Sequence, residues 1–180
     1  MKSLVKYTLL FILAAGIWPA AHAADARDAY KYFFNDSFGD FKEELQNARA
    51  QGKKGIMVFF EMDECPFCHY MKENVFSQAE VQAYFRANFL LLAVDIEGDV
   101  EMVDFNGEHI KQKDFAARHR VRATPVIGFF DLDGNKTTRY TGRTADANEF
   151  MLLGKYVLDE HYKTMPFVNF KRDTRWATAP

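Results

Sequence analysis

The chain has 180 residues, a formal net charge of −2 at neutral pH and 16% aromatic residues, 18 of them phenylalanine. This length is expected for one domain, and the aromatic content predicts a core that needs no cross-links. The slight negative charge argues against a nucleic-acid-binding protein, which needs a basic surface.

Residues 1–23 have the pattern of a secretory signal peptide. Lys2 and Lys6 precede an apolar run at 7–18, and the sequence Ala-His-Ala ends at Ala23. The run is short for a membrane span, although an uncleaved anchor is the alternative. Cleavage after Ala23 would leave 157 residues and change the charge from −2 to −4, because only lysines are lost. We therefore expect export to an oxidising compartment.

Apolar periodicity and turn residues predict helices alternating with strands. Phe38, Phe41, Leu45 and Ala48 share a helical spacing, and Ser77 with Glu80 forms a capping-box pattern. In chain order, the predicted elements are a helix at 37–54, a strand at 55–62, a helix at 65–76 continued by one at 78–88, a strand at 89–96, a helix at 112–121, strands at 126–131 and 136–142, and a helix at 145–162.

The remaining segments are less regular. Residues 24–35 are predicted to be irregular or a short helix, and residues 163–180 form a polar and aromatic tail with no assigned element. Residues 97–111 look like an insertion, with Asn106-Gly107 as a hairpin turn between strands at 103–105 and 108–110. Insertions of this kind are tolerated at surfaces, so decoration is favoured over partner docking.

The connections predict the sheet. A helical crossover joins the strands at 55–62 and 89–96, so these two should be parallel. A three-residue turn joins the strands at 126–131 and 136–142, so these should be antiparallel. The predicted fold class is therefore α/β, with a mixed central sheet of at least four strands and helices on both faces.

The chain has two cysteines, Cys65 and Cys68, separated by Pro-Phe. The pair fits a metal clip, a structural staple or a redox-active dithiol. A staple across so small a loop would remove little entropy from the unfolded chain. A zinc site could use both cysteines and His69, with a fourth ligand from His109, His119 or His161. Structural zinc usually takes a second paired motif, which is missing, so no metal is expected.

Acidic residues gather around the insertion. They are Asp95, Glu97, Asp99, Glu101 and Asp104. Their spacing is not that of a calcium-binding loop, so a solvated acidic face is the preferred interpretation.

Three features together resemble the thioredoxin superfamily, over about residues 38–160. A Cys-x-x-Cys lies between an apolar strand and a helix, Thr124-Pro125 precedes the third strand, and Gly142 precedes the last helix. The stretch FFEMDECPFCHYMKENVFSQAEVQAYFRANFLLLAVDI is similar to periplasmic SoxW-type thioredoxins and to the C-terminal domain of the membrane electron-relay reductase of the disulfide-bond system. The resemblance implies a thioredoxin fold at 24–162, with the hairpin inserted near 97–111 and a tail at 163–180.

The resemblance also implies roles for individual residues. Cys65 would be the exposed nucleophile and Cys68 the resolving thiol, joined in a redox-active disulfide when oxidised. Pro125 would be a cis-proline that, with Thr124, presents an extended substrate chain by backbone pairing. The alternative is a trans-proline that starts an edge strand.

The sequence departs from the family pattern near the dithiol. Glu64 stands where many relatives have tryptophan, and Phe59 stands where thioredoxins carry a buried acid. His69, one helical turn after Cys65, is a candidate modulator of the thiolate, as are Glu64 and Glu61. The helix N-terminus favours a thiolate at Cys65, whereas the acidic residues before it oppose one. The alternative for His69 is a solvated position without a role.

The expected function is reduction of substrate disulfides in the periplasm, with no bound cofactor because the cysteines carry the electrons. The partners would be a substrate protein with a disulfide and a membrane electron-relay reductase that recharges the dithiol. A monomer is expected. The alternative is a disulfide oxidase or isomerase, since Pro-Phe resembles the dipeptides of glutaredoxins and oxidants. A metal-binding module or a non-catalytic thioredoxin-fold binding module is less favoured.

Overall fold

The computed structural model describes residues 27–177, so the predicted signal peptide at 1–23 lies outside the described residues. In chain order the elements are α1 (Ala29–Tyr32), α2 (Phe41–Ala50), β1 (Gly55–Glu61), α3 (Pro66–Tyr70), the π-helical turn η1 (Met71–Val75), α4 (Ala79–Asn88), β2 (Phe89–Asp95), β3 (Glu101–Val103), β4 (His109–Lys111), α5 (Gln112–Arg118), β5 (Val126–Phe130), β6 (Lys136–Thr141), α6 (Ala147–Leu158), the 3-10 turn η2 (His161–Lys163) and α7 (Phe167–Ala177).

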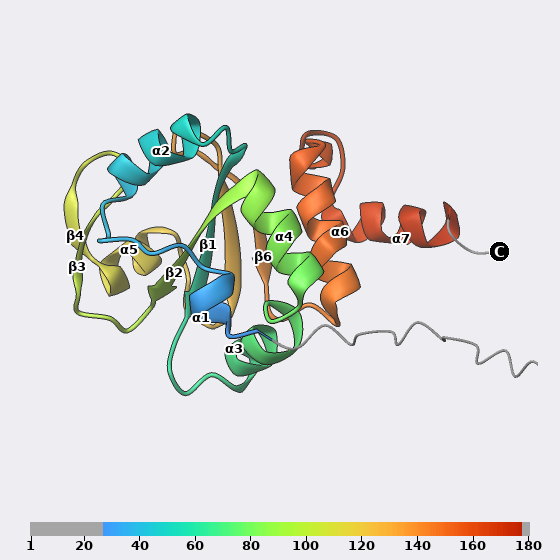
Figure 1. Ribbon diagram of the computed structural model, residues 1–180, viewed down its shortest axis with the longest axis horizontal. Coiled ribbons are helices and arrows are strands. Elements are labelled where there is room, and N and C mark those ends of the chain that lie inside the picture. Colours follow the sequence, from blue (N-terminus) through green and yellow to red (C-terminus); the bar gives the residue numbers. More distant parts are fainter. Residues whose placement is uncertain (1–26, 178–180) are drawn as a thin grey trace, which may run out of the picture.

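A mixed four-stranded sheet in the order β2-β1-β5-β6 forms the centre of the described part of the chain (Figure 1). β1 pairs with β2 in parallel and with β5 antiparallel, and β5 pairs with β6 antiparallel. The predicted strand directions are therefore confirmed. Every residue of β1 and β5 is buried, as expected for apolar strands covered on both faces.

Two hydrophobic clusters cover the two faces of the sheet. Alternate residues of β1 divide between them, because successive side chains of a strand point to opposite faces. Ile56 and Val58 pack with α2, α5 and the β3–β4 hairpin. Met57 and Phe59 pack with α1, α3, α4 and α6, and both cysteines belong to this second cluster. The sheet thus carries helices on both faces, as predicted, and the cysteines lie on the α4–α6 side.

The helix predicted at 37–54 begins later than its apolar spacing indicated. Gly39 has φ +84°, which interrupts a right-handed helix, and the Asp40 side chain then caps α2 by accepting a hydrogen bond from the Glu43 N–H at 2.8 Å. Phe38 falls before this cap and is fully exposed, so its assignment to the apolar face was wrong. Gly52, with φ +66°, follows the end of the helix as expected.

The capping box predicted at Ser77 is also wrong. Gln78 precedes α4 and makes no capping bond with its side chain. The Ser77 hydroxyl instead donates to the Glu73 carbonyl at 2.6 Å, on the preceding π-helical turn. That turn ends with the Phe76 N–H donating to the Met71 carbonyl at 2.8 Å, so the chain bends between α3 and α4.

The insertion folds as a hairpin, as predicted, but both strands are shifted. β3 begins two residues before the predicted strand at 103–105, and β4 begins one residue after the start of the predicted strand at 108–110. β3 and β4 pair antiparallel from Glu101↔Lys111 to Val103↔His109. Asp104 belongs to the turn instead of a strand, because its carboxylate accepts hydrogen bonds from the N–H groups of Asn106 and Glu108. Gly107 has φ +88°, the conformation for which a glycine is suited.

The segment after residue 162, for which the sequence predicts no element, contains α7. Its Phe167 and Phe170 pack against the main cluster through Tyr156, at ring-centroid distances of 5.3 and 5.4 Å. The far end of α7 extends away from the sheet (Figure 1). Within residues 27–177, no helix combines the length and the apolar character needed to cross a bilayer.

Candidate redox-active site

The two cysteines lie at the start of α3, shortly after the end of β1. Cys65 is the N-cap of α3, with extended backbone angles, and Pro66 occupies the first helical turn, where no N–H is required. The Cys68 N–H donates to the Cys65 Sγ at 3.1 Å. The two residues form a disulfide with their Cα atoms 5.2 Å apart. A sulfur at this position receives a backbone hydrogen bond and the positive end of the helix dipole, both of which favour an anion.

Both cysteines are buried in the oxidised protein. Cys65 is 2% exposed and Cys68 is fully buried. The expectation of an exposed Cys65 is therefore wrong for the disulfide form, because its sulfur turns inward to its partner and joins an apolar cluster that includes Phe59 and Met71. Phe67, between the cysteines, is the exposed member of the loop, at 55%.

Thr124 and Pro125 lie at the same edge of the sheet as the dithiol. The register pairs Val126 with Phe60, so the two residues before Val126 are level with the end of β1 from which the dithiol loop leaves. The Thr124–Pro125 peptide bond is cis. The Thr124 Oγ1 atom is buried and has no hydrogen-bond partner within the described residues.

The candidate modulators occupy different positions. The His69 imidazole Nε2 lies 2.8 Å from the Asp63 carbonyl oxygen, so this nitrogen carries the proton and donates. His69 thus ties the helix to the loop just before Cys65. Glu64 is exposed and makes no ion pair within residues 27–177. Glu61 is buried on the face of β1 that also holds Phe59.

Glu61 forms a compact polar cluster with Tyr30 and Lys72. The Tyr30 hydroxyl donates to Glu61 Oε1 at 2.6 Å, and Lys72 Nζ donates to Glu61 Oε2 at 2.8 Å and to the Tyr30 oxygen at 3.0 Å. Burial lowers the pKa of Lys72, but the hydrogen bonds that its ammonium donates to Glu61 and Tyr30 outweigh this effect, and the pKa lies above its ordinary value. Sequence reasoning missed Tyr30, which lies 31 residues before Glu61.

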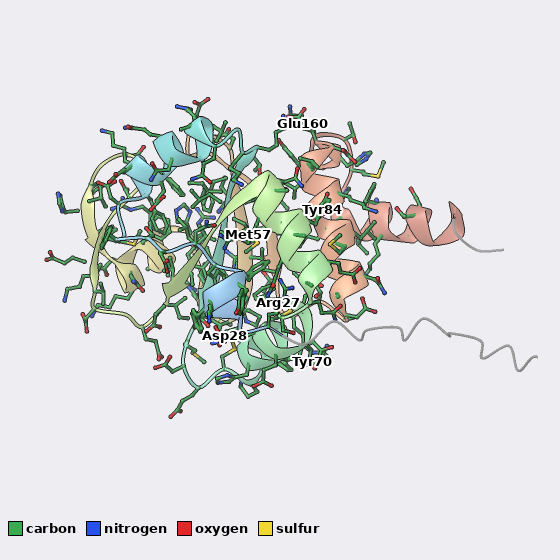
Figure 2. All side chains as sticks on the ribbon, viewed as in Figure 1. Arg27, Asp28, Met57, Tyr70, Tyr84 and Glu160 are labelled. Carbon is green, nitrogen blue, oxygen red and sulfur yellow. A yellow bond between two sulfur atoms is a disulfide. The ribbon has the colours of Figure 1, made fainter. Side chains whose placement is uncertain are left out.

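A second group of residues, which the sequence analysis also did not identify, lies next to the Cys65–Cys68 segment. The Arg143 guanidinium lies over the Tyr70 ring at 4.4 Å and 5.9 Å from the centre of the Phe67 ring. The Tyr70 hydroxyl donates to the Ala145 carbonyl at 2.8 Å. Figure 2 labels Tyr70 at the α3 end of the molecule. The one signal in the sequence was the position of Arg143 next to Gly142, the glycine that marks this connection.

The residues considered as zinc ligands are not arranged as a metal site, and two of them, Cys65 and Cys68, are joined in the disulfide. Among the described residues, no group of three or more His, Cys, Asp or Glu side chains is arranged to hold a metal ion. His119 packs against Phe115 and Phe130, at centroid distances of 4.5 and 5.0 Å, and burial lowers its pKa to about 4. His161 lies against Phe170 at 4.4 Å.

A thioredoxin-like sheet with a vicinal cysteine pair at the N-terminus of a helix defines the class of thiol:disulfide oxidoreductases. The chain belongs to the thioredoxin-like domain family, whose sequence pattern matches residues 41–158.

Known proteins resemble the chain to different extents. It is 26% identical over 144 residues to the thiol:disulfide interchange protein DsbD of Colwellia psychrerythraea, covering 77% of this chain and 22% of that protein. The chain therefore spans about a fifth of the length of this relative. A thioredoxin-fold protein from Helicobacter pylori has a TM-score of 0.58 at 18% identity, covering 69% of this chain and 81% of that one. A putative disulphide-isomerase from Bacteroides thetaiotaomicron has a TM-score of 0.52 at 27% identity, covering 69% and 88%.

Proposed function

We propose that this protein reduces disulfides of substrate proteins in the periplasm, with Cys65 as the attacking thiol and Cys68 as the resolving thiol. The observation that carries the proposal is the position of the Cys65 sulfur. It lies at the N-cap of α3 and accepts the Cys68 N–H at 3.1 Å. Both features stabilise a thiolate, which is the species that attacks a disulfide.

The reaction consists of two exchanges. The Cys65 thiolate attacks one sulfur of the substrate disulfide, which forms a mixed disulfide and releases the other substrate sulfur as a thiolate. The Cys68 thiolate then attacks the Cys65 sulfur, which closes the Cys65–Cys68 disulfide and releases the second substrate sulfur. Two electrons pass to the substrate, whose sulfurs take up the two protons that the dithiol loses. Pro125 and Thr124, at the same edge of the sheet, would present the substrate backbone.

The direction of electron flow depends on the reduction potential, and the alternative is a disulfide oxidase or isomerase. Likeness to a DsbD protein favours a reductase. A reductase in an oxidising compartment must be recharged, so a membrane electron-relay reductase is the partner that we propose. Export would depend on the predicted signal peptide at residues 1–23.

Cysteine variants test the roles of the two thiols. Cys65→Ser should abolish exchange with a protein disulfide. Cys68→Ser should accumulate mixed disulfides with substrate, because the resolving thiol is absent. Non-reducing electrophoresis after acid quenching separates the outcomes, with the double serine variant as the control. Accumulation from Cys65→Ser instead would contradict the assigned roles.

The same protein then gives the direction. Wild-type protein is equilibrated in glutathione or dithiothreitol buffers, and the fraction of dithiol is measured by thiol alkylation. A potential near about −270 mV, as in thioredoxin, supports the reductase. A potential near about −120 mV, as in a strong periplasmic oxidant, contradicts it and favours the oxidase, since about 30 mV is a tenfold change in the equilibrium constant.

A further inference from the structure

Arg143 is an exposed cation held beside the dithiol with no acidic partner. No ion pair of Arg143 occurs within the described part of the chain, although arginines elsewhere, such as Arg49 and Arg118, are paired with carboxylates. Its guanidinium rests on the Tyr70 ring at 4.4 Å. Stacking on an aromatic ring fixes the plane of the guanidinium while leaving its charge unneutralised.

The hydrogen bonds of Arg143 use only one side of its guanidinium. Nη1 donates to the carbonyl oxygens of Thr144 at 3.2 Å and Ala145 at 3.4 Å. Neither Nε nor Nη2 has a partner among residues 27–177. These two nitrogens form the edge of a guanidinium that binds a carboxylate with two parallel hydrogen bonds. The donor edge is therefore oriented by its own loop and available to a ligand.

The fold places this donor edge at the substrate side of the site. The Gly142 N–H donates to the Pro125 carbonyl at 2.8 Å, which joins the Arg143 loop to the cis-proline. Arg143 also lies 5.9 Å from the ring of Phe67, the exposed residue between the two cysteines. A chain bound alongside Pro125 with its sulfur at Cys65 would pass within reach of Arg143.

Charged residues of both signs lie close in sequence to the cysteines and to Thr124. Asp63 and Glu64 are exposed directly before Cys65. Arg122 is exposed two residues before Thr124 and, like Arg143, makes no ion pair among the described residues. A segment that carries negative charge near its cysteine would be attracted by the unpaired arginines and repelled by Asp63 and Glu64, which also orients it.

From this geometry, and on the basis of the proposed function, we propose that Arg143 is a specificity determinant. It binds an acidic side chain close to the cysteine in an extended segment of the substrate polypeptide. Phe67 and Tyr70 supply the apolar surface beneath that segment, and Arg122 adds positive charge two residues before Thr124. The preferred substrate is thus a protein disulfide in an acidic sequence context.

The test uses three short peptides that are identical except for Glu, Gln or Lys beside their single cysteine, each oxidised to its symmetrical disulfide. The reduced wild-type protein should show kcat/KM in the order Glu, Gln, Lys. Arg143→Gln should lower the Glu-to-Gln ratio about fivefold, as expected for one partly exposed charge-assisted hydrogen bond. Arg143→Glu should invert the order. Arg143→Lys should recover only part of the ratio, since it keeps the charge but loses the two-pronged edge.

Arg172→Gln is the matched control, because Arg172 is an exposed arginine on α7. It should leave the Glu-to-Gln ratio unchanged. An unchanged ratio in Arg143→Gln, or an equal loss in both variants, would overturn the proposal. Glutathione disulfide is measured as a further substrate. If Arg143→Gln lowered kcat/KM only for glutathione disulfide and for none of the peptides, the proposal would also be overturned, because the ligand of Arg143 would then be a small carboxylate and not a polypeptide.

Exchange with 2-hydroxyethyl disulfide, which is uncharged, separates this proposal from the function on which it rests. Wild-type protein that reduces this compound but shows no order among the peptides contradicts the role of Arg143 alone. Wild-type protein that reduces neither the compound nor any peptide contradicts the proposed function itself.

Discussion

Glu61, the last residue of β1, is a buried carboxylate that Lys72 and Tyr30 stabilise. Its side chain is 9% exposed and that of Lys72 is 14% exposed, so the two charges interact with little screening by water. Tyr30 completes the cluster, with Lys72 also 4.9 Å from the centre of its ring. Removing one partner of such a pair leaves a buried charge uncompensated, which costs more than the pair itself contributes.

Lys72→Met should therefore lower the free energy of unfolding by about 2–4 kcal/mol, because Glu61 keeps its burial and loses its counter-charge. Tyr30→Phe, which removes only the hydroxyl, should cost about 1 kcal/mol. Urea unfolding of the oxidised proteins at pH 7 measures both. Equal stability of Lys72→Met and wild type would show that the cluster adds nothing to the fold.

The same cluster should respond to alkaline pH. The pKa of Lys72 is raised in the folded protein, so its contribution to stability is complete below the unfolded pKa of about 10.4 and declines as the pH rises through the folded value. In Lys72→Met this part of the decline should be absent.

At the scale of elements, the β3–β4 hairpin is fastened to α5 through one buried carboxylate. Asp104 is 2% exposed and accepts from the N–H groups of Asn106 and Glu108 at 2.8 and 2.9 Å. Arg118 on α5 lies 2.5 Å from its other oxygen and also pairs with Glu108. Burial alone would raise the pKa of Asp104, but the two backbone N–H groups and Arg118 hold it below the ordinary value.

Asp104→Asn should lower the free energy of unfolding by about 1–3 kcal/mol at pH 7, since an amide cannot replace all three contacts. The contribution of Asp104 is present above its unfolded pKa of about 3.9 and is lost as the pH falls through the lower folded value. Denaturation from pH 7 to pH 2 should therefore show wild type and variant converging in acid.

Asp99→Asn is the control next to the same hairpin, because Asp99 precedes β3, is exposed and pairs with Lys111 and Lys113 at the surface. It should change the stability at pH 7 little. A difference between Asp104→Asn and wild type that persists unchanged at pH 2 would contradict the assigned ionisation.

At the scale of the whole molecule, α7 extends the apolar cluster of the α4–α6 face. Phe167 contacts both Tyr140 and Tyr156, at 5.7 and 5.3 Å between ring centroids. Lys171 pairs with the buried Glu149 of α6 at 2.6 Å. The helix lies outside the family match, which ends at residue 158.

Ending the chain after Pro166 should lower the free energy of unfolding by about 2–4 kcal/mol, because Phe167 and Phe170 lose their partly buried contacts and Glu149 loses its cation. The core sheet should remain folded. Thermal and urea unfolding of the truncated protein measure the loss. Val168→Ala, at a position 65% exposed on α7, is the control and should change stability by less than about 0.5 kcal/mol. A truncated protein as stable as the full chain would show that α7 is not part of the folded unit.

Local patterns predicted the central sheet well. Continuous apolar runs identified β1 and β2, and the helical crossover between them predicted their parallel pairing. The short turn between β5 and β6 predicted the antiparallel pairing of these two strands. The same patterns failed where a local competitor intervened. Gly39 and the Asp40 cap make α2 start later than predicted. Asp104 lies in the hairpin turn instead of a strand, because its carboxylate accepts the Asn106 N–H. Apolar periodicity depends only on the spacing of apolar residues. It does not indicate which side-chain oxygen will accept a hydrogen bond from a backbone N–H and so end or displace an element.

The sequence by itself determined the class of the protein. The strand, the Cys-x-x-Cys, the helix and the proline before the third strand are local signals, so they can be read without knowing which segments meet. The tertiary structure alone decided the surroundings of the dithiol. Tyr30 meets Glu61 across 31 residues, and Tyr70 meets the Arg143 loop across 75. Such contacts arise from the packing of the helices against the sheet, and their partners follow no sequence spacing.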